Sequence, residues 1–179
     1  MATIREIWLR PNRRALWFGT VPPSLLFLLG AWITFGLEQP VAHWRLWVGG
    51  ALMLVGGVLA GGLISQMRRP RIAYRHGEVL FYLRSSTPLA VPAELVEAFF
   101  LGQGPLVLPG APQEDATVNL VARLSQRAPE WSHREVKPAL GRWCDGYVTI
   151  RGTWCEPLNG EVIRRLNHRL REVSEARLS

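Results

Sequence analysis

Two long apolar segments without a charged residue dominate the first part of the chain. They cover residues 15–37 and 46–67. At about 1.5 Å of rise per residue, a helix of either length can cross the ~30 Å hydrocarbon core of a bilayer, whereas a helix in a soluble core rarely needs that length. The pattern therefore predicts two transmembrane helices, and the short link of residues 38–45 predicts an antiparallel hairpin.

Arginines flank the two apolar segments asymmetrically. Only Arg45 lies in the link, while four arginines precede the first segment and four follow the second: Arg5, Arg10, Arg13, Arg14, Arg68, Arg69, Arg71 and Arg75. The positive-inside bias predicts a multi-pass protein of the cell membrane with both termini in the cytoplasm. Because neither segment contains an ionisable residue, an anchor is favoured over a transport pathway.

One face of the second apolar segment consists of small residues. Gly50, Gly57 and Gly61 recur at helical spacing, and small residues let helix backbones approach closely in lipid. This face is predicted to pack on the first helix, and the alternative is packing on another copy of the chain. In the first segment, Pro22 and Pro23 remove backbone donors, so that helix is predicted to kink or to begin there.

After residue 67 the pattern changes to short alternating segments punctuated by glycine and proline, which is typical of strands. The predicted strands are residues 72–75, 78–84, 89–91, 95–101, 118–124 and 147–151, with a weaker one at 135–140.

The end of the chain has a helical period instead. Leu158, Val162, Leu166, Leu170 and Val173 form one apolar stripe, which predicts an amphipathic helix capped near residue 159 that packs on the sheet rather than on a membrane. The predicted organisation is a basic segment at 1–14, the hairpin at 15–67 and a cytoplasmic α+β domain at 68–179. In that domain a curled antiparallel sheet or partly open barrel is closed by the C-terminal helix.

The formal charge of +7 raises the question of a nucleic-acid partner. Much of the arginine excess lies beside the membrane segments, where topology and lipid contact account for it, and no recognition motif is present. A nucleic-acid partner is therefore not expected. The arginines at positions 68, 69, 71 and 75 are instead candidate contacts for anionic lipid headgroups.

Residues 102–115 are rich in glycine and proline and are predicted to be irregular. Long loops inside compact domains are often functional, so this stretch is the first candidate for partner contact, and the alternative is an insertion without a role. The candidate residues at its start are Gly102, Gln103, Gly104 and Pro105.

No catalytic, cofactor-binding or metal-binding constellation is recognisable. The Gly102-Gln103-Gly104 triplet lacks the third glycine of a nucleotide fingerprint. Cys144 and Cys155, with only distant histidines, match no usual zinc site, and both are predicted to be reduced and buried. Trp131, Trp143 and Trp154 are predicted to lie in the core, or else in an aromatic patch facing a ligand or partner.

The basic step Arg68-Arg69-Pro70-Arg71, the strand pair at 72–84 and the closing helix at 158–173 follow two membrane segments. This layout resembles that of the bacterial pleckstrin-homology-like membrane proteins. The resemblance implies an adaptor or assembly platform without catalytic activity. The expected function is therefore a membrane-anchored interaction module that binds a protein partner or itself. The alternatives are recognition of anionic headgroups by the juxtamembrane arginines and a role as accessory subunit of a membrane enzyme.

Overall fold

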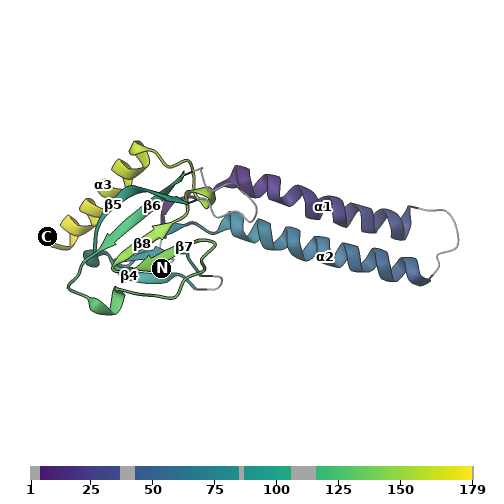
Figure 1. Ribbon diagram of the computed structural model, residues 1–179, viewed down its shortest axis with the longest axis horizontal. Coiled ribbons are helices and arrows are strands. Elements are labelled where there is room, and N and C mark those ends of the chain that lie inside the picture. Colours follow the sequence, from purple (N-terminus) through teal and green to yellow (C-terminus); the bar gives the residue numbers. More distant parts are fainter. Residues whose placement is uncertain (1–4, 37–42, 85–86, 106–115, 179) are drawn as a thin grey trace. The chain divides into compact units, whose positions relative to one another are not determined.

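A computed structural model (Figure 1) describes residues 5–36, 43–84, 87–105 and 116–178 and divides the chain into two compact units. The helical unit is Arg13–Arg69, and the sheet unit combines Met1–Asn12 with Pro70–Ser179. The N-terminal segment is thus mostly part of the sheet unit. The chain leaves that unit after Asn12 and returns to it at Pro70.

The helical unit contains α1 (Arg13–Phe35) and α2 (His43–Arg68), which pack against each other. Both helices are long and apolar enough to cross a membrane, as the charge-free segments predict. Helix α1 runs through Pro22 and Pro23, so it does not begin at the prolines. Most of the predicted link lies outside the described residues.

The two helices approach most closely at glycines. A Cβ atom added to Gly30 of α1 would lie 2.6 Å from the carbonyl oxygen of Gly49, and one added to Gly56 would lie 2.7 Å from the backbone nitrogen of Phe27. Real Cβ atoms do not approach backbone atoms this closely, so only glycine allows the helices to meet there.

The glycine face predicted from the sequence needs a correction of one residue. A Cβ atom at Gly50 or Gly61 would meet nothing within 4 Å, and one at Gly57 would touch only the ring of Phe27, at 3.7 Å. The face that meets α1 therefore contains Gly49 and Gly56. Packing of the Gly50, Gly57 and Gly61 face on another copy of the chain stays a prediction.

The sheet unit contains two antiparallel four-stranded sheets, and its described strands do not close into a barrel. The first sheet has the order β1-β2-β3-β4, with β1 (Glu6–Leu9), β2 (Ile72–Arg75), β3 (Glu78–Phe81) and β4 (Leu89–Pro92). The second has the order β5-β6-β8-β7, with β5 (Val96–Pro105), β6 (Ala116–Leu124), β7 (Gly141–Cys144) and β8 (Tyr147–Ile150).

Two hairpins turn on a residue pair with positive φ. His76 and Gly77 have φ values of 51° and 83°, and Asp145 and Gly146 have values of 54° and 76°. Pairs of this kind match the twist of the strands that they join. The first turn confirms the predicted hairpin between β2 and β3, whereas strand β7 before the second turn is absent from the sequence prediction.

Helix α3 (Gly160–Leu178) follows the last strand. Its start is confirmed, because the side-chain oxygen of Asn159 accepts a hydrogen bond from the backbone nitrogen of Val162 at 3.0 Å. Its apolar stripe packs into the core of the sheet unit, with Val162, Leu166 and Leu170 buried. The same core contains side chains of both sheets, among them Trp8, Phe81 and Trp143.

Three other predictions differ from the structure. Residues 135–140 form no strand; they are held by bonds such as that from the backbone nitrogen of Lys137 to the carbonyl oxygen of Leu83, at 3.0 Å. Residues 102–105 are not a loop but the end of β5, paired with β6, and the rest of that stretch, 106–115, lies outside the described residues. Cys144 is exposed, whereas Cys155 is buried as predicted.

Candidate functional site

The two points where the chain leaves and re-enters the sheet unit are held by one carbonyl group. The oxygen of Trp154 accepts a hydrogen bond from the backbone nitrogen of Asn12 and another from Nε of Arg71, both at 3.0 Å. The backbone nitrogen of Arg71 also donates to the carbonyl oxygen of Leu9. Both connections to the helical unit therefore start from one fixed place in the sheet unit.

This role removes Arg71 from the predicted headgroup contacts. Only 3% of the residue is exposed, and burial lowers the pKa of its guanidinium. A side chain buried in this way is not available to a lipid headgroup. Arg68 and Arg69 belong to the helical unit and Arg75 to the sheet unit, so the four arginines do not form one cluster within either unit.

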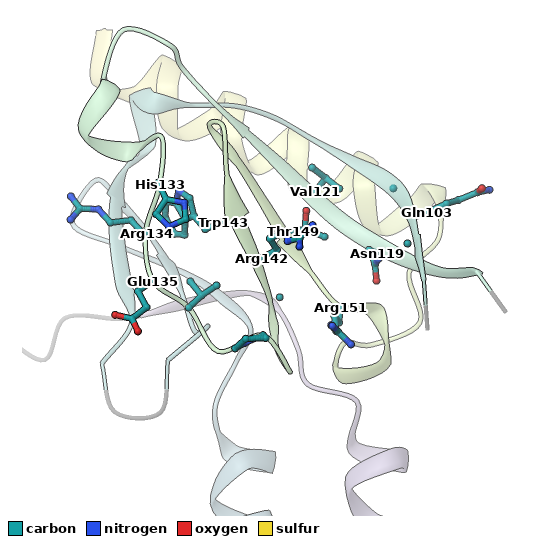
Figure 2. Close-up of a pocket in the computed structure, with 15 residues that line it drawn as sticks. Gln103, Asn119, Val121, His133, Arg134, Glu135, Arg142, Trp143, Thr149 and Arg151 are labelled. Carbon is teal, nitrogen blue, oxygen red and sulfur yellow. The ribbon is translucent and has the colours of Figure 1, made fainter. Parts of the chain in front are cut away.

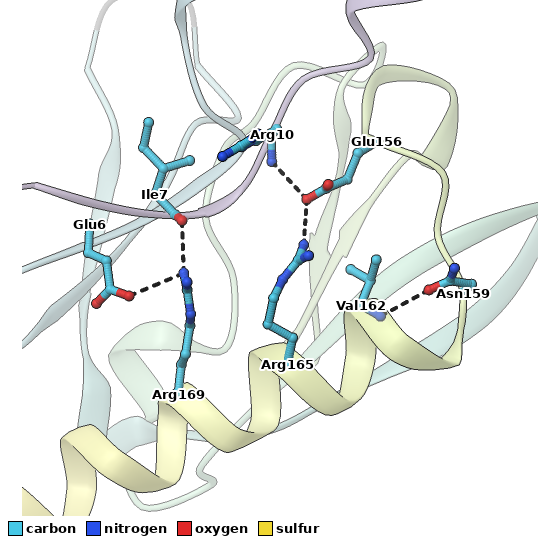
Figure 3. Close-up of polar contacts among 8 residues, drawn as sticks. All are labelled: Glu6, Ile7, Arg10, Glu156, Asn159, Val162, Arg165 and Arg169. Carbon is cyan, nitrogen blue, oxygen red and sulfur yellow. Dashed lines mark hydrogen bonds and ion pairs between the residues drawn. The ribbon is translucent and has the colours of Figure 1, made fainter.

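Helix α3 holds the N-terminal strand through two arginines (Figure 3). Arg165 pairs with a carboxylate oxygen of Glu156 at 2.7 Å, and the same oxygen accepts a hydrogen bond from the backbone nitrogen of Arg10. One turn later, Arg169 donates to the carbonyl oxygen of Ile7 at 2.9 Å. Strand β1 is thus fixed on one side by β2 and is also tied to α3.

A groove of about 570 Å³ lies on the second sheet (Figure 2). Its lining comes from all four strands of that sheet and from residues 133–138. Val121, Thr149 and Arg142 are register partners on three neighbouring strands and therefore share one face. The next residues along each strand, Ala122, Val148 and Trp143, belong to the core, so the groove is on the opposite face.

Three of the four predicted partner-contact residues line this groove. Gly102, Gln103 and Gly104 do so from β5, whereas Pro105 is not among the lining residues. A Cβ atom at Gly102 would lie 2.7 Å from a methyl group of Val121, and one at Gly104 would collide with the side-chain nitrogen of Asn119. The two glycines therefore let large side chains of β6 lie flat against β5.

Two arginines give the groove its charge. Arg142 of β7 is exposed and Arg151, next to the end of β8, is half-buried, and neither side chain forms an ion pair within the described parts of the chain. The third arginine of the lining is already engaged, because the guanidinium of Arg134 lies over the Trp131 ring, 4.7 Å from its centre. Glu135 is the acidic residue of the lining.

The lining offers hydrogen-bond donors, chiefly the guanidinium groups of Arg142 and Arg151, rather than a recognisable set of reactive groups. The floor includes Asn119, which is buried and accepts a hydrogen bond from the backbone nitrogen of Gly152 at 3.2 Å.

Elsewhere in the sheet unit, burial raises the pKa of the Cys155 thiol to about 12, so this cysteine is a neutral core residue at ordinary pH. Within the described ranges, no three His, Cys, Asp or Glu residues are grouped to hold a metal ion.

The three tryptophans of the predicted core or patch have different surroundings. Trp143 is buried, stacks on Trp131 with 6.1 Å between ring centres and donates from its indole nitrogen to the carbonyl oxygen of that residue. Trp154 is half-buried and donates to the carbonyl oxygen of Ala139 at 2.8 Å. The core interpretation is thus confirmed for Trp143.

No family model, curated protein or solved structure matches this chain. The pleckstrin-homology-like architecture accordingly stays a prediction from the layout of the elements.

Proposed function

We propose that this protein is a membrane-anchored interaction module without catalytic activity. In this proposal the helical unit spans the membrane twice and the sheet unit, with a pleckstrin-homology-like layout, is presented at the cytoplasmic face. The observation that carries the proposal is the outward apolar surface of the hairpin. Phe18, Trp47 and Leu54 are 77, 81 and 68% exposed, which is unfavourable in water and ordinary in lipid.

The proposed partner is another protein or a second copy of the chain. Support comes from the groove of the sheet unit, where Arg142 and Arg151 form no ion pair within the described residues. Crosslinking in the native membrane, followed by purification in mild detergent, is expected to recover a stoichiometric complex. Consistent recovery of a lone monomer would contradict the proposal.

The orientation can be tested with a native thiol. Cys144 is exposed and Cys155 is buried, so a membrane-impermeant maleimide should label Cys144 only after the cells are permeabilised. In a Cys144→Ser background, His43→Cys, in the link predicted to face outward, should be labelled in intact cells. The reverse labelling pattern would refute a cytoplasmic sheet unit.

The lipid alternative has less support than the sequence suggested. Headgroup recognition was based on four juxtamembrane arginines, and the guanidinium of Arg71 is instead used inside the sheet unit. No observation on the described residues favours the alternative of an accessory enzyme subunit. We therefore keep protein interaction as the proposed function.

A further inference from the structure

We propose that the groove on the second sheet binds an extended acidic peptide segment of a partner protein, with Arg142 and Arg151 as its charge contacts. This inference rests on the proposed interaction function and specifies the surface and the chemistry of the partner.

The first argument is the placement of the two arginines. Arg142 is opposite Thr149, and the backbone nitrogen of Arg151 bonds the carbonyl oxygen of Leu140 at 3.0 Å, which extends the same ladder. Arg142 and Arg151 are therefore diagonal neighbours on one face, a relation in which Cα atoms are about 7–8 Å apart. Positive charges on two such neighbouring side chains repel each other, so an anion bound between them is favoured.

The same sheet shows what a paired arginine looks like. Arg123 on β6 forms an ion pair with Glu97 of β5 at 2.9 Å. By contrast, the chain supplies no carboxylate partner to Arg142 or Arg151 within its described parts. Guanidinium groups bind carboxylates in a two-pronged geometry with charge-assisted hydrogen bonds. Asp or Glu side chains of a partner match these two positions.

The second argument is the length of the groove. It crosses four strands, which at about 4.8 Å between neighbours corresponds to roughly 15 Å, or four to five residues of extended peptide at about 3.3 Å each. A volume of about 570 Å³ also lies within the ~300–1,000 Å³ range of binding cavities. A single headgroup phosphate would use only the end with the arginines.

The lining along this length suits a peptide backbone. Asn119 contributes an amide group, Val121 and Val136 contribute apolar surface, and Gln103 lines the groove at β5 with its side chain pointing away from it. Two glycines of the lining, Gly102 and Gly104, leave the groove face of β5 without side chains. Figure 2 shows Arg142 of the edge strand β7 beside Thr149, and the side chain of Arg134 pointing away from both.

The test uses the full chain in nanodiscs of zwitterionic phosphatidylcholine and a fluorescent peptide of alternating Glu and Ser, about eight residues long so that it exceeds the groove. Fluorescence anisotropy at low salt should show binding that weakens as salt is added. A matched peptide of alternating Gln and Ser should bind at least about tenfold more weakly, as expected when one charge-assisted contact is lost.

The variants separate the groove from general surface charge. Arg142→Gln and Arg151→Gln should each weaken binding of the Glu peptide about tenfold. Arg164→Gln, which removes an exposed arginine of α3, should leave binding unchanged. The double charge reversal, Arg142→Glu with Arg151→Glu, should lose the Glu peptide and bind a Lys and Ser peptide instead.

Two outcomes of the binding test would overturn the inference. One is the absence of peptide binding at low salt, and the other is equal binding of the Glu and Gln peptides or an equal effect of Arg164→Gln. If the peptide does not bind and the two groove variants lose binding to vesicles of anionic phosphatidylglycerol, the groove is assigned to lipid instead. If the native-membrane complex forms and survives both groove substitutions, the interaction function stands and only this inference fails.

Discussion

The two units of this protein use the same residue type in opposite ways. The chain has eight tryptophans, and they divide equally between the units. In the hairpin they point outward, with Trp17 at 67% and Trp47 at 81% exposed, whereas in the sheet unit Trp8 and Trp143 are each 1% exposed.

The difference is the one expected if the hairpin lies in lipid, as proposed, and the sheet unit in water. The sheet unit removes its large apolar side chains from water by packing them into one core, which stabilises it by about 25 cal/mol for each Å² buried. The hairpin leaves its large side chains outside and brings backbones together instead, at Gly30, Gly49 and Gly56. Without a hydrophobic drive between helices, close backbone packing is what remains to hold a pair in lipid.

The largest expected effect is at the core tryptophan. Trp143→Ala should destabilise the sheet unit by about 3–5 kcal/mol, because a large cavity is left beside Phe81 and Trp131. Denaturant unfolding followed by near-ultraviolet circular dichroism measures the loss. The matched control is Trp47→Ala in the hairpin, expected to stay within about 0.5 kcal/mol. Equal losses of unfolding free energy in the two variants would contradict the proposed difference between the units.

The next effect is at the helix contact. Gly56→Leu should destabilise the hairpin by about 1–3 kcal/mol or more. The Cβ atom alone would lie 2.7 Å from the backbone nitrogen of Phe27 and 2.7 Å from the carbonyl oxygen of Pro23, so the leucine side chain would clash with the backbone of α1. Gly61→Leu, with open space around it, should be tolerated. Titration with sodium dodecyl sulfate, followed by the loss of helical circular dichroism, measures the stability of the hairpin in each variant. A larger effect at Gly61 would show that the packing of α2 on another surface is the more important one.

The sequence predicts best where the local pattern and the packing agree. The charge-free segments locate α1 and α2 to within a few residues, and alternation locates β6 and β8. Strand β1 has no such pattern over its four residues and exists because it pairs with β2. The rotation of α2 is also hidden, because an apolar helix without a polar face does not reveal which glycines meet a neighbour.

The groove depends on contacts that sequence spacing does not contain. Arg142 and Arg151 become neighbours through the register of β7 and β8, and Gly102 reaches the same face from a distant strand. The one local signal was the Asp145-Gly146 pair, which is typical of a tight hairpin. Read together with the alternation before and after it, this pair would have indicated β7 and placed both arginines on one face.

A smaller effect is expected at the edge of the second sheet. Asn167 of α3 accepts a hydrogen bond from the backbone nitrogen of Phe99 and donates to its carbonyl oxygen, both at 2.8 Å. Asn167→Ala should cost about 1–3 kcal/mol, because two backbone groups of β5 lose their partners. Hydrogen exchange at the Phe99 amide should become faster, while His168→Ala on the exposed side of α3 serves as control. Helices of the hairpin need no such side-chain cover, since their backbone bonds are internal.

The control outcome decides what the asparagine does. If His168→Ala accelerates exchange at Phe99 as much as Asn167→Ala does, the effect comes from general loosening of α3 and not from the two bonds to β5.

The smallest effect is a loss of stability at alkaline pH that belongs to the sheet unit alone. Burial raises the pKa of Cys155 to about 12 in the folded chain, from a reference value of 9.0. The neutral thiol therefore stabilises the fold fully below pH 9, and this contribution declines as pH rises from 9 toward 12. Between pH 9 and 10 the loss is about 1 kcal/mol, because the unfolded chain releases the proton first.

Comparison with Cys155→Ala isolates this contribution from other groups that titrate in the same range. Chemical unfolding at pH 8, 9 and 10 should show a steeper decline for the wild type than for the variant. Cys144→Ala should stay close to the wild type, because Cys144 is exposed and the pKa of its thiol is raised mainly by a hydrogen bond to Asp145, an interaction that solvent screens. Both cysteines lie in the sheet unit, so the difference reports on its core and not on the hairpin. Parallel declines for all three proteins would mean that water reaches Cys155 and that the sheet unit is less completely sealed than its buried tryptophans indicate.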